Sequence, residues 1–139
     1  MIRRYFTDRD LGRRFPLALR AAGFDVEAHD DVFAHDVPDE EWLEHVGTNG
    51  LVGITHDGRI RYKPNELDAV RVHRVSLIVL VGKVPHAALA ENFIRTRIRI
   101  ESSLDRQAPP FVAKVLCPSP AALKSAPEAQ GEILRWYPR

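Results

Sequence analysis

The sequence contains few of the residues that crosslink a chain or anchor it in a membrane. Among 139 residues there is one cysteine, Cys117, which excludes an internal disulfide and a zinc site built from several cysteines. The longest apolar run, over residues 75–81, is far shorter than the ~20 residues of a membrane-spanning helix. We therefore expect a cytoplasmic protein that does not enter a membrane.

Two common kinds of site also have no sequence signal. The six histidines include no pair spaced four residues apart, so a helical zinc site is not indicated. A phosphate-binding loop is not indicated either, because Gly82 and Lys83 lack the rest of the glycine-rich motif and Val84 replaces its hydroxyl residue. Carboxylates are therefore the stronger candidates for chemistry.

The net charge of +1 conceals a strong separation of charge along the chain. Residues 25–45 contain nine acidic residues and no lysine or arginine, whereas basic residues gather in residues 3–20, 59–74 and 95–106. A basic surface beside an acidic pocket suits a metal-dependent enzyme that acts on a polyanion, since bases bind phosphate and acids bind metal. Alternating solvated faces would give the same pattern.

Apolar patterns predict alternating strands and helices. The predicted strands cover residues 3–7, 25–29, 51–55, 75–81 and 111–116, and the predicted helices cover residues 11–22, 39–46, 63–73 and 85–106. The run at residues 75–81 is almost continuously apolar, which indicates a strand buried on both faces. The alternation predicts an α/β fold, a three-layer α/β/α sandwich with a mainly parallel sheet.

We divide the chain into a body and a tail. Residues 1–116 hold all the predicted strands, and a hydrophobic fraction of 45% is ordinary for one soluble domain. Residues 117–139 are rich in proline and alanine and are interpreted as a linker-like tail. Within this tail, residues 128–136 are predicted to form a short helix that docks on the body or on a partner.

Two predicted strands end in the same way. Thr7 is followed at once by Asp8, and Thr55 is followed by His56 and Asp57. Central strands of an open parallel sheet border the ligand crevice at their carboxyl ends, so we expect Asp8 and Asp57 to share one crevice. Converging carboxylates suit a hard divalent cation such as Mg²⁺, and hence phosphate chemistry. Each aspartate could equally cap a helix or a turn.

Three further acids are candidates for the same crevice. Asp10 lies two residues after Asp8 and could either complete the cluster or cap the helix that begins there. Asp39 begins a predicted helix directly after Pro38, a position typical of N-capping. Glu40 is its neighbour, and either of these two acids could face the crevice.

Three motifs, in this order, resemble the PIN-like ribonuclease toxins of VapBC toxin–antitoxin pairs. They are Phe6-Thr7-Asp8-Arg9-Asp10-Leu11, Asp36-Val37-Pro38-Asp39-Glu40-Glu41-Trp42 and Ile54-Thr55-His56-Asp57-Gly58-Arg59. The run Arg61-Tyr62-Lys63-Pro64-Asn65-Glu66-Leu67 is similar to the small PIN-like VapC subgroup in particular. The resemblance implies a PIN-like nuclease domain over residues 1–116, with a PIN-like sheet.

The resemblance also implies which acids form the site. Asp8 matches the first acid, Asp39 or Glu40 the helical acid, and Asp57 the last acid. Asp10 stands where many members have asparagine. These carboxylates would bind Mg²⁺ or Mn²⁺, which lowers the pKa of a bound water and stabilises charge on the scissile phosphate.

The activity implied by the resemblance is that of a toxin endoribonuclease. RNA would be the substrate, and Arg59, Arg61 and Lys63, just after the last acid, would hold its backbone. The same three residues could instead be a solvated basic face. A cognate antitoxin would silence the enzyme, and an apolar helix face left free by such a sheet would allow a homodimer.

Two other functions are open at this stage. A phosphoacceptor receiver domain would use Asp57 as acceptor, with Asp8, Asp10 and Lys114 in supporting roles. Such a domain needs serine or threonine after its fourth strand, where this chain has Gly82. A PIN-like fold without catalysis, retained as a binding module, is the other alternative.

Overall fold

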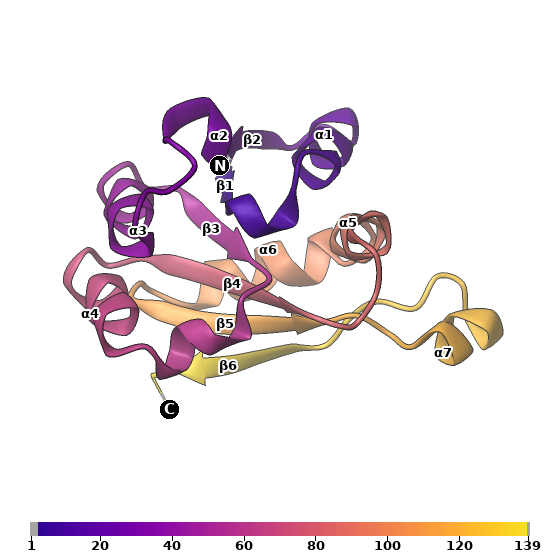
Figure 1. Ribbon diagram of the computed structural model, residues 1–139. Coiled ribbons are helices and arrows are strands. Elements are labelled where there is room, and N and C mark those ends of the chain that lie inside the picture. Colours follow the sequence, from indigo (N-terminus) through magenta and orange to yellow (C-terminus); the bar gives the residue numbers. More distant parts are fainter. Residues whose placement is uncertain (1–2, 139) are drawn as a thin grey trace.

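Six strands form one continuous sheet in the order β2-β1-β3-β4-β5-β6 (Figure 1). The structure, a computed structural model, describes residues 3–138. The strands are β1 (Arg4–Thr7), β2 (Asp25–Ala28), β3 (Val52–Thr55), β4 (Ser76–Val81), β5 (Phe111–Leu116) and β6 (Ile133–Tyr137). Neighbouring strands are parallel except β5 and β6, which are antiparallel.

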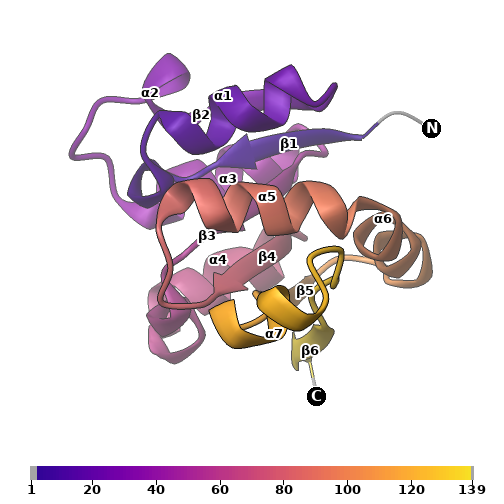
Figure 2. The ribbon, with the colours of Figure 1, turned by 90° about the vertical axis from the view of Figure 1, so that its right-hand side faces the viewer.

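Helices cover both faces of this sheet, so the fold has three layers (Figure 1; Figure 2). The α-helices are α1 (Arg14–Ala21), α2 (His29–Val32), α3 (Asp39–Thr48), α4 (Pro64–Val72), α5 (His86–Arg95), α6 (Arg97–Arg106) and α7 (Pro120–Ser125), and the 3₁₀ helices are η1 (Arg9–Leu11) and η2 (Gly58–Tyr62). α1, α5 and α6 pack on one face, and α3, α4 and η2 pack on the other. The predicted α/β/α sandwich with a mainly parallel sheet is confirmed.

The two faces of β1 belong to different halves of the core. Tyr5 packs in the apolar cluster under α1 and α5, together with Phe15 and Phe93. Phe6 faces the other layer and stacks on Trp42 of α3, with ring centroids 5.6 Å apart. Because both faces of this strand are buried, a one-residue slip would bring each side chain to the wrong layer, and the position of the following residues is fixed.

A single long helix over residues 85–106 was predicted, and this prediction is wrong. The structure has two helices, α5 and α6, with Thr96 between them. Thr96 is fully buried, and its hydroxyl accepts a hydrogen bond from the Gly131 N–H at 3.0 Å. The break lies at a residue whose hydroxyl binds a distant segment, which helical periodicity does not reveal.

The C-terminal segment is part of the sheet. Residues 133–137 form strand β6, so the helix predicted over residues 128–136 is wrong, and the helix of this segment is α7. Trp136 and Tyr137 pack against the apolar cluster on the side of α3 and α4. Residues 133–137 form a strand because the edge of β5 offers them a hydrogen-bonding partner. The composition of residues 117–139 alone did not indicate this pairing.

The strand order creates a crevice at the carboxyl ends of β1 and β3. From β1 the chain continues to β2 on one side and then crosses to β3 on the other side. At such a switch point the connections leave in opposite directions and expose the strand ends to ligands. Within residues 3–138, no helix has the length and apolar character needed to cross a bilayer.

Candidate active site

Four aspartates border one pocket of about 450 Å³ at this crevice; they are Asp8, Asp10, Asp39 and Asp57. Asp8 follows β1 and caps η1, where its side chain accepts a hydrogen bond from the Arg9 N–H at 2.7 Å. Asp57 follows β3 and caps η2. The structure therefore brings together four acids that lie up to 49 positions apart in the chain.

The hydroxyl of Thr55 connects the acids. Thr55 is fully buried and donates to Asp8 Oδ2 at 2.8 Å, with Asp10 Oδ2 at 3.3 Å from the same oxygen. The hydroxyl oxygen also accepts from the Asp57 N–H at 3.1 Å. The His56 N–H donates to Asp10 Oδ2 at 3.1 Å. This role of Thr55 was not predicted, although its position at the strand end, two residues before the last acid, was the available signal in the sequence.

Two of the acids are held in surroundings that disfavour their ionised forms. Asp8 is 9% exposed, and burial raises its pKa to about 7, with repulsion from Asp10 adding to the effect. Asp10 is more open to solvent, yet the surrounding protein displaces part of its water and raises its pKa to about 6. Repulsion from Asp57 and Asp39 contributes to this shift. A bound cation would relieve both effects.

Asp57 and Asp39 have donors around them instead. Burial works against ionisation of Asp57, but hydrogen bonds from the Arg59 side chain and backbone outweigh it and hold the pKa of Asp57 below its ordinary value. The Arg59 N–H and Nε lie 3.0 and 3.1 Å from Asp57 Oδ1. Asp39 Oδ1 accepts from Trp42 Nε1 at 2.9 Å, so the core indole orients this carboxylate.

The Lys63 ammonium lies among carboxylates. Its Nζ is 3.3 Å from Asp57 Oδ2, 3.9 Å from Asp39 Oδ2 and 3.8 Å from Glu66 Oε1. Partial burial opposes the charge of Lys63, but the hydrogen bond and attraction from Asp57 outweigh it and raise its pKa. Lys63 is therefore a counter-ion of the acids in this structure. Glu66, which sequence analysis missed as a neighbour of the site, is the first acid of α4.

Other predicted site residues are placed differently. Glu40 does not border the aspartate pocket; it lines a separate one with Asn65 and Asp68 on α4, so the structure does not bring it together with the four aspartates. Arg59 borders the aspartate pocket with a side chain that is 80% exposed. The side chain of Arg61 lies outside the described part of the structure.

The donor set of the aspartate pocket fits a hard divalent cation, because carboxylate and hydroxyl oxygens are its preferred ligands. Asp8 and Asp10 form no ion pair with any described side chain, and the Thr55 hydroxyl oxygen lies within hydrogen-bond distance of both carboxylates. Within the described residues, however, no three acidic, histidine or cysteine side chains converge closely enough to hold a metal ion as they stand. Asp8, Asp10, Asp39 and Asp57 border the pocket from different sides of the crevice without forming such a cluster.

A model of the PIN-like domain family matches residues 3–82, more than half of the chain. The chain belongs to the PIN-like domain family. No curated protein and no solved structure matches it. The matched residues run from the beginning of β1 to the end of β4 and include all four aspartates of the pocket.

The PIN-like chain is poorly arranged for a receiver domain. Lys114, which would have to reach the acceptor Asp57, does not border the aspartate pocket. Its Nζ lies over the Trp136 ring, 4.7 Å from the centroid. The family match and this placement both favour the PIN-like assignment over phosphoacceptor chemistry.

Proposed function

We propose that this PIN-like protein is an endoribonuclease that uses Mg²⁺ or Mn²⁺, and that it is a toxin of the small VapC type. The observation that carries the proposal is the pocket bordered by Asp8, Asp10, Asp39 and Asp57 at the switch point of the sheet. PIN-like domains are commonly nucleases, and acids at this position are suited to metal-assisted phosphodiester hydrolysis.

The acids of the pocket would hold the cation. Asp8, Asp10 and Asp57 follow the strand ends, and Asp39 projects from α3 with its carboxylate oriented by an indole hydrogen bond. The bound cation would lower the pKa of a water and stabilise negative charge on the scissile phosphate. Thr55 would keep the Asp8 carboxylate in place by its 2.8 Å hydrogen bond.

Basic residues at the pocket would hold the RNA backbone. Arg59 is largely exposed beside Asp57, so its guanidinium could turn toward a phosphate oxygen. Lys63 would exchange its carboxylate partners for the phosphate once a cation neutralises them. Arg61 stays in the proposal on its sequence position alone.

A cleavage assay tests this proposal. Purified protein is incubated with total RNA in Mg²⁺, in Mn²⁺ and in EDTA, and the same reactions are run with Asp8→Asn and Asp57→Asn. We expect cleavage only with a cation. Each variant should cleave at least about 100-fold more slowly, because loss of even a residue that only supports a metal ligand costs up to about 100-fold.

Two acids outside the pocket are the controls. Asp36 is an exposed acid three residues before Asp39, and Glu40 lines another pocket. Both Asp36→Asn and Glu40→Gln should cleave RNA at nearly the parental rate. Full activity of Asp57→Asn in Mg²⁺ would remove the assignment of the site.

A binding module without catalysis is the second candidate. It is favoured by the lack of a tight three-ligand cluster within residues 3–138 and by Lys63 lying among the acids. A Mg²⁺-dependent rise in thermal stability that disappears in Asp8→Asn would count against this candidate. No shift in the wild-type protein, together with no cleavage, would overturn the nuclease proposal.

The biological setting belongs to the same proposal. The similarity of residues 61–67 to the VapC subgroup supports a toxin that is neutralised by a cognate antitoxin protein and acts on RNA in the cytoplasm. A homodimer would use an apolar helix face, and the exposed Ile98 on α6 is one such residue, with 80% of its surface accessible.

A further inference from the structure

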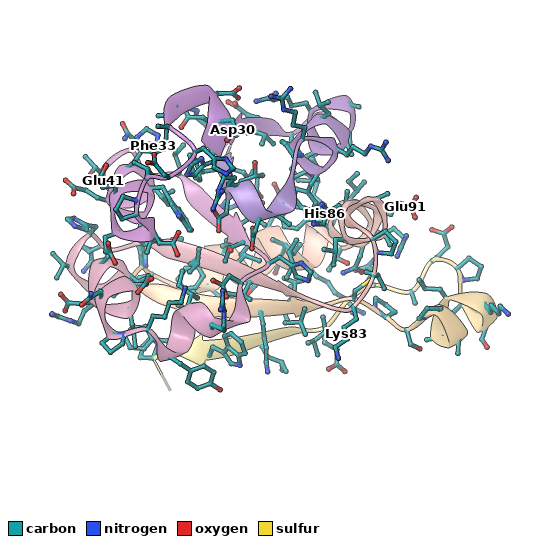
Figure 3. The ribbon with its side chains drawn as sticks, viewed as in Figure 1. Asp30, Phe33, Glu41, Lys83, His86 and Glu91 are labelled. Carbon is teal, nitrogen blue, oxygen red and sulfur yellow. The ribbon has the colours of Figure 1, made fainter. Side chains whose placement is uncertain are left out.

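A second pocket adjoins the aspartate pocket on the side of β2. It measures about 370 Å³ and lies between η1, α1 and α2, with Asp30 of α2 at its wall (Figure 3). Asp8 and Arg9 border both pockets. A chain that enters one pocket therefore passes these two residues to reach the other.

The walls of the second pocket combine arginines with an apolar surface and with the carboxylates of Asp30 and Asp31. Arg13 is exposed and makes no hydrogen bond or close ion pair with any described residue. The pKa of Asp31 is lowered by its hydrogen bond from Arg20 and, to a smaller extent, by the charge of Arg13. Arg20 is held in place by Asp31 Oδ2 at 2.9 Å and by the Val26 carbonyl at 2.9 Å. Leu17, next to these cations, is 58% exposed although it is apolar.

Two buried polar side chains of the same wall have unused hydrogen-bonding capacity. Thr7 is 1% exposed, and its hydroxyl has no hydrogen-bond partner among the described residues. His29 is 3% exposed, and its Nδ1 makes no hydrogen bond within residues 3–138, with Asp30 Oδ1 3.5 Å away. Both atoms are closed to solvent, so a ligand in the pocket would contact other atoms of the wall.

We propose that this pocket binds the base of a nucleotide next to the scissile phosphate of single-stranded RNA. Proteins read unpaired RNA by stacking bases on flat or apolar side chains and arginine planes, and by hydrogen bonds to base edges. Leu17 provides the exposed apolar surface, and Arg13 provides the cation. The inference rests on the proposed nuclease function.

The position of the pocket explains how binding would serve cleavage. A base seated here would place its phosphate at Asp8 and Arg9, where the two pockets meet. The pocket would then select the cleavage site by the nucleotide that it accepts, because only a seated base would bring the phosphate to the acids.

Cleavage rates of RNAs that each lack one base test the proposal. A short RNA with one defined cut site is made in versions that each lack one base near the cut. In the wild-type protein, loss of one particular base should slow cleavage roughly tenfold. Arg13→Ala and Leu17→Glu should slow cleavage of the intact RNA by a similar factor and should show little further loss with that abasic substrate.

Matched variants separate this effect from changes in charge or stability. Arg106→Ala removes an exposed arginine at the end of α6, and Val72→Glu places a carboxylate at an exposed apolar position of α4. Both should keep the full tenfold sensitivity to the missing base. Equal sensitivity to the abasic site in Arg13→Ala and in the wild type would overturn the proposal.

A binding readout separates failure of this inference from failure of the nuclease proposal. The ¹⁵N-labelled protein is titrated with the four nucleoside 5′-monophosphates without a divalent cation. Amide shifts at Gly12, Ala28 and Asp30, lost in Arg13→Ala, would support the pocket even if the wild type cleaves no RNA. If the wild type cleaves RNA but these amides do not shift, the base lies elsewhere and the inference is wrong.

Discussion

Thr55 shows how much of the site depends on one side chain. Its buried hydroxyl lies within hydrogen-bond distance of two carboxylates and also accepts the Asp57 N–H. A hydroxyl has one proton to donate, so it satisfies Asp8 and leaves Asp10 to the His56 N–H. Asp8 and Asp10 are thus stabilised by neutral donors, the Thr55 hydroxyl and the His56 N–H.

The raised pKa values of Asp8 and Asp10 predict how stability depends on pH. In the unfolded chain both acids ionise near pH 4, whereas in the folded protein they ionise near pH 7 and 6. The contribution of these two carboxyls to the free energy of unfolding is therefore fully present below about pH 4, where both are protonated. It is lost as the pH rises through 6 and 7 and both ionise in the folded protein. In EDTA, Asp8→Asn should be more stable than the wild type at pH 8, and this advantage should disappear near pH 4.

Urea unfolding at several pH values between 4 and 8 measures this difference. Asp36→Asn, which changes an exposed acid, should follow the wild-type curve at each pH. Mg²⁺ at pH 8 should stabilise the wild type and not Asp8→Asn. If the difference in free energy of unfolding between Asp8→Asn and the wild type stayed constant across this pH range, the pKa of Asp8 would not be raised by folding.

The position of Lys63 predicts that its ammonium competes with the metal ion for the Asp57 carboxylate. Its ammonium lies 3.3 Å from Asp57 and would have to leave that carboxylate when a cation binds. Lys63→Met should therefore increase Mg²⁺ affinity by up to about fivefold, which corresponds to the upper value for a partly exposed ion pair. Isothermal titration calorimetry measures this affinity, and Lys124→Met on α7 controls for the change in net charge. Unchanged or weaker binding in Lys63→Met would argue against competition.

At the scale of the element, three helices end with the same turn. In each, the N–H of the third residue past the helix end bonds to a carbonyl five residues earlier: Phe24 to Leu19, Leu51 to Val46 and Val75 to Val70. The residue before each donor has a positive φ, and it is Gly23, Gly50 and Arg74 respectively. Arginine occupies a left-handed conformation that favours glycine, with φ of 53°.

This turn predicts a stabilising substitution. Arg74→Gly should raise the free energy of unfolding by up to about 1 kcal/mol, because it removes the steric cost of a left-handed side chain. Gly23→Ala is the mirror experiment: no atom lies within 4 Å of the added methyl, so its cost of about 1 kcal/mol is conformational. Chemical denaturation measures both, and a destabilised Arg74→Gly would show that the arginine side chain makes a compensating contact.

The same elements show why local prediction succeeded where it did. Gly23 and the glycines at residues 47–50 marked helix ends that the structure confirms. The helix-start signal at residues 63–66 also located α4, although no glycine marks its end. The break at Thr96 was missed, because the partner of its hydroxyl is Gly131, 35 residues away.

At the scale of the whole molecule, β6 closes one edge of the sheet. It pairs with β5 beyond the residues that the family model matches, and Trp136 and Tyr137 add to the apolar cluster on the side of α3 and α4. The Trp136 ring also lies 3.7 Å from the position that a Cβ on Gly58 would occupy, next to Asp57. The C-terminal strand thus supports the segment that carries the last acid.

A chain that ends at Leu116 should accordingly lose stability. Removing β6 exposes an edge of β5 and the apolar surface under Trp136, and we expect a loss on the order of 3 kcal/mol together with aggregation. Thermal unfolding and light scattering measure both effects. Leu134→Gln, at an exposed position of the retained strand, is the control and should be close to neutral. An equally stable, monomeric truncated chain would support the separate tail predicted from composition.

The sequence by itself determined the alternating strands and helices, the parallel sheet and the strand ends that carry Asp8 and Asp57, because these follow from apolar periodicity and local residue order. The tertiary structure decided which other side chains meet there. Glu40 and Asp39 are adjacent in the chain, but consecutive helical residues point about 100° apart, so Asp39 borders the pocket and Glu40 lines another. Long-range packing likewise decided that Thr55 connects the acids, that Lys63 lies among them, and that residues 133–137 complete the sheet.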